Sequence, residues 1–367
     1  MVPRPTHSTV SPPFDTASRS PALLEQARRG DERAFQELVV PFLDELRAHG
    51  YRMLGSIHDA EDAVQDGMLR AWKGLPGFED RSSIRTWLYR IVTNVCLTRI
   101  ARRPRALPDA IGPACDPASV EWGDKVEASW IGPYPTRLAS VATSSDPEAR
   151  YAMRESVELA FVAAVQHLPG SQRAALLLRD VLGFSAKESA AVLDTTVASV
   201  NSALQRARAS TGRRLPDDSQ RATLDTLGDR RVRDLAGSYA DAWERGDTAA
   251  IVAMLAEDAT FAMPPHPVWL AGRDDIAAFL PRGPLQVRWR LRRAEVNGQL
   301  AFGCYVWAND ERRFVPHSID VLTLRGDRIA RIVAFLDLDA DTFERFGLPP
   351  GAPPTAPRNG EVRPTDR

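Results

Sequence analysis

The distribution of proline constrains the fold of this chain more than any other sequence feature. Residues 104–147 contain seven prolines, whereas residues 20–103 contain only three. Proline removes a backbone donor and obstructs a helix interior, so a helical core cannot run through residues 104–147. The chain is therefore expected to fold as separate blocks joined by a long linker, and its 367 residues leave room for two or three domains.

Composition and periodicity predict six segments along the chain. They are a disordered tail (1–19), a helical block (20–103), a Pro-rich acidic linker (104–147), a second helical block (148–214), a block of helices followed by strands (225–347) and a second disordered tail (348–367).

The overall composition excludes several classes of protein. A hydrophobic content of 44% excludes a largely disordered chain, and no apolar run approaches the roughly 18 residues of a membrane helix. The first twenty residues lack the apolar segment of a signal peptide. Cys96, Cys115 and Cys304 lie far apart and predict neither a disulfide framework nor a zinc site. We expect a cytoplasmic protein that needs no metal or cofactor and binds no membrane.

The net charge of −1 conceals regions of opposite sign. Residues 31–66 contain nine acids and three arginines, whereas residues 81–105 contain seven arginines and no acid. A chain with a total charge near zero can therefore present one surface to a basic protein and another to nucleic acid.

The acidic part includes an amphipathic helix over residues 59–72. Ala60, Val64, Met68 and Trp72 recur every four residues, and acidic side chains lie on the opposite face. This face is either a solvated surface or a binding surface for a basic partner.

The basic part interleaves arginines with aromatic residues. Such a helix suits single-stranded or melting DNA, because arginines bind phosphates while rings stack on unpaired bases. Leu88, Ile91 and Val95 are predicted to pack inward, with Arg85 and Arg90 outside. The alternative is a buried Trp87 beside arginines that are merely solvated.

Residues 168–214 predict a helix-turn-helix. Gly183 ends one helix, Ser185 and Glu188 form a capping box for the next, and Thr196 caps a third helix over 197–209. Two short helices joined by a tight turn, with a basic end, are typical of duplex DNA readers. The polar face of the last helix is predicted to enter the groove, with arginines on the phosphates.

The C-terminal block predicts helices packed on one face of a curved antiparallel sheet, an α+β cone. Strand-like runs cover 259–263, 285–296, 300–307, 314–324 and 329–336. A cone enzyme needs a general base in an apolar cavity, and no paired motif here fixes a mechanism. Catalysis is not expected, and a ligand pocket or a docking surface is favoured. The candidate pocket residues are Tyr239, Trp243, His266, Trp269, Tyr305, His317 and Asp320.

Both helical blocks, in this order, resemble the conserved regions of an extracytoplasmic-function (ECF) sigma factor of the sigma-70 family. The first match consists of residues 59–66, 69–72, Phe78 and 85–91 with Asn94. The second consists of Leu168-Pro169, Gln172-Arg173, 183–185 and 204–208. The sequence departs from the family at Ala203, where a basic residue is usual, and at Ser189, where a β-branched apolar residue is common.

The resemblance implies two all-α sigma domains, a region 2 helical bundle and a region 4 helix-turn-helix, and a role in transcription initiation without covalent chemistry. The implied partners are core RNA polymerase, through its β′ clamp helices and β subunit, and promoter DNA. Core polymerase would contact Asp59, Glu61, Asp62, Gln65 and Asp66. The −10 element would contact Phe78, Arg81, Arg85, Trp87, Arg90 and Asn94. The −35 element would contact Thr196, Ser199, Asn201, Ser202, Gln205, Arg206 and Arg208.

The pattern from Tyr239 to Ala259 resembles a SnoaL-like domain of the nuclear transport factor 2 superfamily, and its place behind the sigma regions indicates the SigG-like subgroup. We expect this domain to modulate activity in cis, with a small-molecule ligand or an anti-sigma protein as further candidate partners. The acidic linker is a flexible spacer, a phosphate mimic in the polymerase channel, or a segment whose residues 130–135 dock on the C-terminal domain.

Two other functions remain open from the sequence. One is a ligand-sensing helix-turn-helix regulator that does not use core polymerase. The other is a SnoaL-like isomerase or hydrolase. The first leaves the acidic and basic helices of residues 59–105 unexplained, and the second needs a catalytic base such as His317 or Asp320.

Overall fold

The computed structural model describes residues 21–79, 82–100, 105–110, 112–120, 130–139 and 155–352. The tail predicted at 1–19, Arg81 and the acidic middle of the linker at 121–129 lie outside the described residues. The chain forms two compact units. The helical unit takes in residues 1–102, 138–156 and 164–214, and the C-terminal unit takes in 103–137, 157–163 and 215–367.

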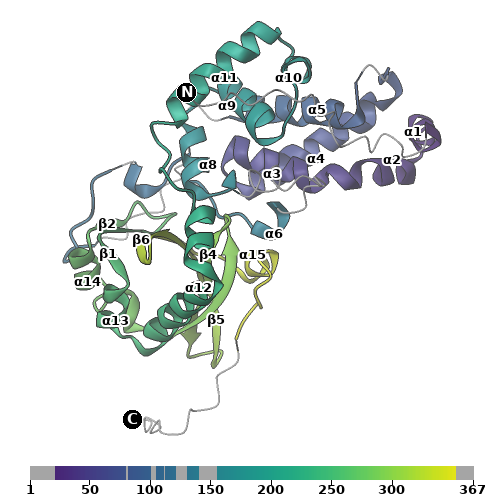
Figure 1. Ribbon diagram of the computed structural model, residues 1–367. Helices are drawn as coiled ribbons and strands as arrows, with labels where there is room; N and C mark the ends of the chain where they lie inside the picture. The colour runs from purple at the N-terminus through teal and green to yellow at the C-terminus, as the bar shows by residue number, and fades with distance from the viewer. Residues whose placement is uncertain are drawn as a thin grey trace. The chain divides into compact units, whose positions relative to one another are not determined.

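The helical unit begins with a bundle of helices (Figure 1). Its elements are α1 (Pro21–Arg28), α2 (Glu32–Val39), η2 (Val40–Phe42), α3 (Leu43–Leu54), α4 (Ile57–Gly74), η3 (Leu75–Gly77) and α5 (Ile84–Arg99). Gly55, at φ 72°, ends α3, and the Ser56 hydroxyl accepts from the backbone N–H of Asp59 at 3.3 Å to start α4. Ser83 caps α5 in the same way, accepting from Thr86 N–H at 3.1 Å.

Small residues let helices α3, α4 and α5 approach closely. A Cβ placed on Gly50 of α3 would lie 3.1 Å from the Cβ of Ala60, and one on Gly67 of α4 would lie 2.7 Å from Cγ2 of Val92. Ala60, Ala63 and Ala71 of α4 are buried along this contact. The helix predicted over 59–72 therefore packs through its small residues on one side.

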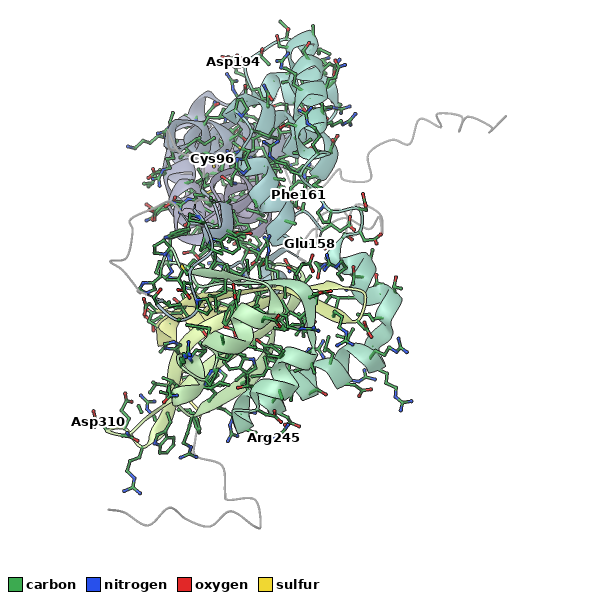
Figure 2. All side chains as sticks on the ribbon, turned by 90° about the vertical axis from the view of Figure 1, so that its left-hand side faces the viewer. Cys96, Glu158, Phe161, Asp194, Arg245 and Asp310 are labelled. Atoms are coloured by element: carbon green, nitrogen blue, oxygen red, sulfur yellow. The ribbon has the colours of Figure 1, made fainter. Side chains whose placement is uncertain are left out.

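The second part of the helical unit contains the predicted helix-turn-helix. Its elements are α8 (Leu159–Gln166), of which residues 164–166 belong to this unit, α9 (Gly170–Leu176), the π-helical turn η5 (Leu177–Val181), α10 (Ala186–Val192) and α11 (Val197–Thr211). The capping box is confirmed, since Ser185 Oγ accepts from Glu188 N–H at 3.1 Å and Glu188 Oε2 accepts from Ser185 N–H at 2.8 Å. The predicted cap at Thr196 is also confirmed, at 3.1 Å from Ser199 N–H. Figure 2 shows Asp194 in the tight turn between α10 and α11.

The C-terminal unit is built on a six-stranded sheet in the order β2-β1-β6-β5-β4-β3. Its elements from residue 215 onward are α12 (Gln220–Arg245), α13 (Thr248–Ala253), β1 (Leu255–Ala262), β2 (Trp269–Ala271), α14 (Arg273–Phe279), η6 (Pro284–Gln286), β3 (Trp289–Val296), β4 (Gln299–Ala308), β5 (Arg313–Arg325), β6 (Arg328–Leu336) and α15 (Ala340–Arg345). The predicted antiparallel sheet is mixed in one respect, because β1 pairs with β6 in parallel. Strands β3 to β6 form an antiparallel meander, in which β6 is an edge strand. Strand β1 pairs with this edge.

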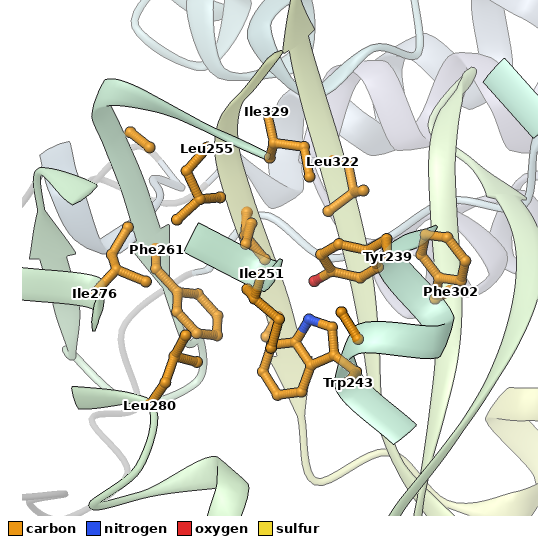
Figure 3. Packing of buried hydrophobic residues seen from close by; sticks show 14 of the residues in the cluster. Tyr239, Trp243, Ile251, Leu255, Phe261, Ile276, Leu280, Phe302, Leu322 and Ile329 are labelled. Atoms are coloured by element: carbon orange, nitrogen blue, oxygen red, sulfur yellow. The ribbon is translucent and has the colours of Figure 1, made fainter. Parts of the chain in front are cut away.

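The core of this unit lies between α12 and the sheet. Figure 3 shows Tyr239 and Trp243 of α12 pointing toward buried rings and aliphatic side chains of the sheet and α13. The ring centroids of Tyr239 and Phe302 are 5.0 Å apart, and those of Trp243 and Phe261 are 6.5 Å apart. The packing continues past the domain end predicted at residue 347, since Leu348 is buried and Ala352 pairs with Phe314.

No helix in the described part of the chain combines the length and apolar character needed to span a membrane.

The close approach of α4 to α5 gives a stability prediction. Gly67→Ala is expected to destabilise the protein, although alanine is the better helix former. The new Cβ would lie 2.7 Å from the Val92 side chain, and a valine in a helix has little rotamer freedom. We expect a loss of about 1–3 kcal/mol from overpacking, measured by calorimetric unfolding of the full chain.

Gly237→Ala in α12 is the matched control, because a Cβ there would meet nothing within 4 Å. It is expected to stabilise the protein by up to about 1 kcal/mol. A Gly67→Ala protein that is as stable as the wild type would contradict the close packing of α4 on α5.

Candidate functional site

The side chains of α4 divide among three directions. The small residues face the bundle core, and Glu61 and Gln65 border a groove that runs between α4 and α2. Asp62 and Asp66 face α5 instead, where Arg99 contacts both carboxylates. The acidic face expected from the sequence is therefore two surfaces, and Arg99 holds the carboxylates of the second.

The groove beside α4 has a volume of about 600 Å³ and apolar walls. Phe35, Val39 and Val40 contribute from α2 and η2, and Met68 and Leu69 contribute from α4. Val40 and Leu69 are unusually exposed for apolar residues, at 59% and 56%. Met68 and Trp72 belong to the apolar stripe predicted for this helix, and both line this groove. The border of the groove carries Glu32 and Glu61 with Arg47. An exposed apolar groove with two carboxylates at its border is suited to a partner with an apolar surface and basic side chains.

The exposed side of α5 carries part of the residues expected at the −10 element. Trp87, Arg90 and Asn94 have the spacing i, i+3, i+7 and share one helix face. Arg90 and Asn94 are exposed, and Trp87 is half-buried with its ring 5.0 Å from that of Phe78. Phe78 itself is buried, so its ring supports Trp87. We define this surface of Trp87, Arg90 and Asn94 as the α5 stripe.

Arg85 departs from the expected outward position. Its guanidinium lies 4.6 Å from the ring of Phe184 and 5.1 Å from that of Tyr89, and its Nη2 donates to Glu45 Oε2 at 3.2 Å. Tyr89, which is fully buried, donates to the same carboxylate oxygen at 3.2 Å. Burial and the Glu45 carboxylate raise the pKa of Tyr89, so the phenol stays protonated. Arg85 therefore joins α3, α5 and the segment before α10.

Arg173 makes a second junction inside the helical unit. Its guanidinium is buried and donates to the carbonyl oxygens of Met53, Gln166 and Leu168 and to Gln166 Oε1. Gln166 in turn donates from Nε2 to the carbonyl oxygen of Arg52 at 3.1 Å. These bonds fix the start of α9 against the end of α3. The Gln172-Arg173 motif in the sequence does not by itself predict this role of Arg173.

The outward face of α11 holds all seven residues expected at the −35 element. Thr196, Ser199, Asn201, Ser202, Gln205, Arg206 and Arg208 are all exposed. Arg208 is engaged, because its guanidinium donates to both carboxylate oxygens of Asp180 at 2.6 and 2.8 Å. Ala203 packs inward against Ala175, Ala190 and Val200, so it does not belong to the outward face.

The C-terminal unit encloses a cavity of about 270 Å³ beside the core of α12. Of the candidate pocket residues, Trp243, His317 and Asp320 line this cavity. The Tyr239 hydroxyl donates to Asp320 Oδ2 at 3.4 Å from behind the carboxyl. The other three lie elsewhere: His266 contacts Asp337, Trp269 donates from Nε1 to the carbonyl oxygen of Gly112, and Tyr305 donates to that of Pro349.

A β-bulge explains why His317 and Asp320 line the same cavity. Strict alternation would place residues 317 and 320 on opposite faces of β5. The partners of Cys304 and Tyr305 are Ser318 and Pro316, so His317 is an extra residue in the pairing of β4 with β5. Such an insertion breaks the alternation, and the adjacent Pro316, which a strand interior tolerates mainly at a bulge, is its one sequence signal.

The described parts of the linker pack on the C-terminal unit. Asp109, in η4 (Pro108–Ala110), forms an ion pair with Arg331 at 2.7 Å. Tyr134 N–H donates to Asn297 Oδ1 at 3.0 Å, and Asn297 N–H donates back to the Tyr134 carbonyl oxygen at 2.8 Å. Thr136, which begins α6 (Thr136–Ala139), accepts from Gly298 N–H at 2.9 Å. Of the alternatives for the linker, docking of residues 130–135 describes these contacts best.

Within the described residues, no three His, Cys, Asp or Glu side chains gather as metal ligands.

Comparison with known proteins identifies three domains in this chain. The Sigma-70 region 2 profile matches residues 38–106, the Sigma-70 region 4 profile matches 158–210, and the SnoaL-like domain profile matches 236–332. The chain therefore contains both sigma regions and the C-terminal domain that the sequence resemblance predicted.

Full-length relatives agree with the domain matches. The chain is 41% identical over 347 residues to the ECF RNA polymerase sigma factor SigG of Mycobacterium tuberculosis strain H37Rv, covering 93% of this chain and 89% of that protein. It is 30% identical to the RNA polymerase sigma-H factor of Pseudomonas aeruginosa, over 53% of this chain and 92% of that one. The crystal structure of M. tuberculosis SigJ shares the fold, with a TM-score of 0.52 and 23% identity over 85% of this chain and 99% of that one. This chain belongs to the family of ECF RNA polymerase sigma factors.

Proposed function

We propose that this sigma factor binds core RNA polymerase through the α4 groove and its acidic border, reads and melts the −10 element with the α5 stripe, and reads the −35 element with α11. The observation that carries the proposal is that the α4 groove and two side chains of the α5 stripe, Arg90 and Asn94, are open to solvent beside a complete helix-turn-helix. A regulator that acts without polymerase would have no use for the groove. The chemistry of transcription belongs to the polymerase, and this chain supplies recognition.

The partner of the groove is inferred from its charge and shape. An apolar floor favours an amphipathic helix, and the carboxylate of Glu61 favours basic side chains at its border. The clamp helices of the polymerase β′ subunit are the partner that the family suggests. Asp62 and Asp66 contribute less directly, because Arg99 neutralises part of their charge.

We further propose that the C-terminal domain modulates transcription in cis through the linker. The support is the set of contacts by which Asp109, Tyr134 and Thr136 attach the linker to Arg331, Asn297 and Gly298. A linker attached through its segments 105–110 and 130–139 is restricted in the positions it can take on the polymerase. The domain would then take the place of a separate inhibitory protein.

Leu69→Asp tests the polymerase surface. Leu69 is 56% exposed, so the substitution should leave the fold intact, but it places a charge where an apolar contact is proposed. We expect the affinity for purified core polymerase to fall about tenfold or more, measured by fluorescence anisotropy with labelled chain. Thr226→Asp, at an exposed position of α12, is the control. Unchanged affinity of the Leu69→Asp chain would place the polymerase contact elsewhere.

The double substitution Arg90→Ala with Asn94→Ala tests the α5 stripe. It should lower open-complex formation on duplex promoter DNA, and a template already unpaired at the −10 element should restore much of the loss, because melting is then no longer required. Permanganate footprinting measures the opening. Arg231→Ala removes a charge at an exposed position of α12 as the control. An equal defect on both templates would argue against a melting role.

Arg206 and Arg208 are predicted to differ in the salt dependence of −35 binding. Each phosphate contact contributes about 0.9 to the slope of log K against log salt concentration. Arg206→Ala should lower this slope by nearly that amount, and Arg208→Ala by clearly less, because Asp180 already binds the guanidinium of Arg208. Titration of holoenzyme with promoter DNA measures both slopes. Equal slopes for the two variants would contradict the roles assigned here.

Asp109→Asn combined with Thr136→Val tests the linker contacts in the full chain. Loss of the ion pair and of one hydrogen bond should loosen the linker, and run-off transcription should rise by about fivefold or more if the domain is inhibitory. Asp116→Asn, in a described linker segment but without an ion pair to the sheet, is the control. Transcription that stays at the wild-type level would contradict a regulatory role of these contacts.

A further inference from the structure

The cavity of the C-terminal unit has aromatic walls and one acidic group. Trp243, Phe261, Phe279 and Trp289 contribute rings to its lining, and Asp320 contributes a carboxyl from β5. Val287, which lines the same cavity, is 47% exposed and marks a side open to solvent. A small molecule could therefore reach the carboxyl along a path bordered by rings.

The Asp320 carboxyl is buried among neutral hydrogen-bond donors. The Ser318 hydroxyl donates to Oδ1 at 3.0 Å and the Tyr239 hydroxyl donates to Oδ2 at 3.4 Å. Burial raises the pKa of Asp320 to about 6, and hydrogen bonds from Ser318, Cys304 and Tyr239 oppose the rise. The group is therefore mostly ionised at neutral pH.

No cation neutralises this carboxylate within the part of the chain that the structure describes. Its described partners are a hydroxyl, a phenol and a thiol, with no arginine or lysine among them. His317 lines the same cavity, but burial lowers its pKa, against a smaller opposing effect of Asp337, so its imidazole is neutral at pH 7. Buried carboxylates in proteins are normally paired with a cation.

We propose that this cavity binds a small organic ammonium ion with an apolar ring body, whose ammonium group pairs with Asp320 and whose ring lies against Trp243 and Trp289. The ammonium supplies the countercharge that the described residues do not. The aromatic faces favour a cation electrostatically, and tryptophan does so most strongly. A carboxylate ligand would meet repulsion from Asp320, and a neutral ligand would leave the buried charge without a counterion.

The test uses three ligands that share one ring system and differ in charge. Naphthylmethylamine, naphthylmethanol and naphthoate are titrated into the full chain by isothermal calorimetry at neutral pH. The amine is expected to bind at least about tenfold more tightly than the alcohol, and the naphthoate is expected not to bind. A chain that binds the alcohol or the naphthoate as tightly as the amine would overturn the proposal, and so would a chain that binds none of the three.

Variants of the cavity assign the binding to Asp320. Asp320→Asn keeps the size of the side chain and removes its charge, so the preference for the amine over the alcohol should disappear. Asp327→Asn, in the exposed turn between β5 and β6, removes the same charge at the surface and should change amine affinity by less than about fivefold. A preference for the amine that survives in the Asp320→Asn chain would overturn the proposal.

Ala334→Leu tests the cavity with a second variant, whose loss of binding can be distinguished from misfolding. Ala334 lines the cavity and is the cross-strand partner of Asp320, so leucine there narrows the space and leaves the carboxyl in place. Amine affinity should fall at least about tenfold, with the far-ultraviolet circular dichroism of the wild type retained. Unchanged amine affinity in this variant would place the binding outside the cavity. Every readout here is ligand binding by the free chain, so the outcome is independent of the sigma-factor proposal.

Discussion

The buried guanidinium of Arg173 sets how the two parts of the helical unit pack. A buried cation is costly unless its donors are directed at acceptors, and burial lowers the pKa of Arg173 to about 10, which still leaves it charged at neutral pH. Nη1 and Nη2 donate to carbonyl oxygens at the end of α3 and before α9 and to the Gln166 amide, while Nε has no acceptor among the described residues. Because those acceptors come from both parts, the charge can be satisfied only where the parts meet.

Arg85 joins the same two parts of the helical unit and is therefore not exposed on the surface proposed to bind DNA. A guanidinium held by Glu45 and two rings is unavailable to phosphate until those contacts are released. Within the α5 stripe Arg90 and Asn94 remain exposed, with Arg90 3.8 Å from the Asp194 carboxylate. The outward face of α11 is exposed as well, with Arg208 held by Asp180. The residues proposed for the −35 element are thus exposed, whereas those proposed for the −10 element are partly engaged in the packing of the helical unit.

Much of the helical architecture could be predicted from the sequence because it depends on local signals. Ser185 with Glu188, the cap at Thr196 and the left-handed glycine at Gly183 act over a few residues, and each was found where expected. Arg85 was misplaced because its partners Glu45 and Phe184 are distant in sequence. For the same reason the sequence did not predict the contacts of Arg173, the pairing of Tyr134 with Asn297 or the parallel pairing of β1 with β6. His317 breaks the alternation through a bulge whose position only Pro316 marks in the sequence.

Run-off transcription with purified core RNA polymerase tests the central claim most directly. The template would carry a promoter selected by the reconstituted holoenzyme from random sequence, and core enzyme alone would be the reference. The account predicts a transcript of defined start that requires this chain and is lost when either the −10 or the −35 element is scrambled. Core polymerase whose initiation is unaffected by the chain, on every selected template, would contradict it.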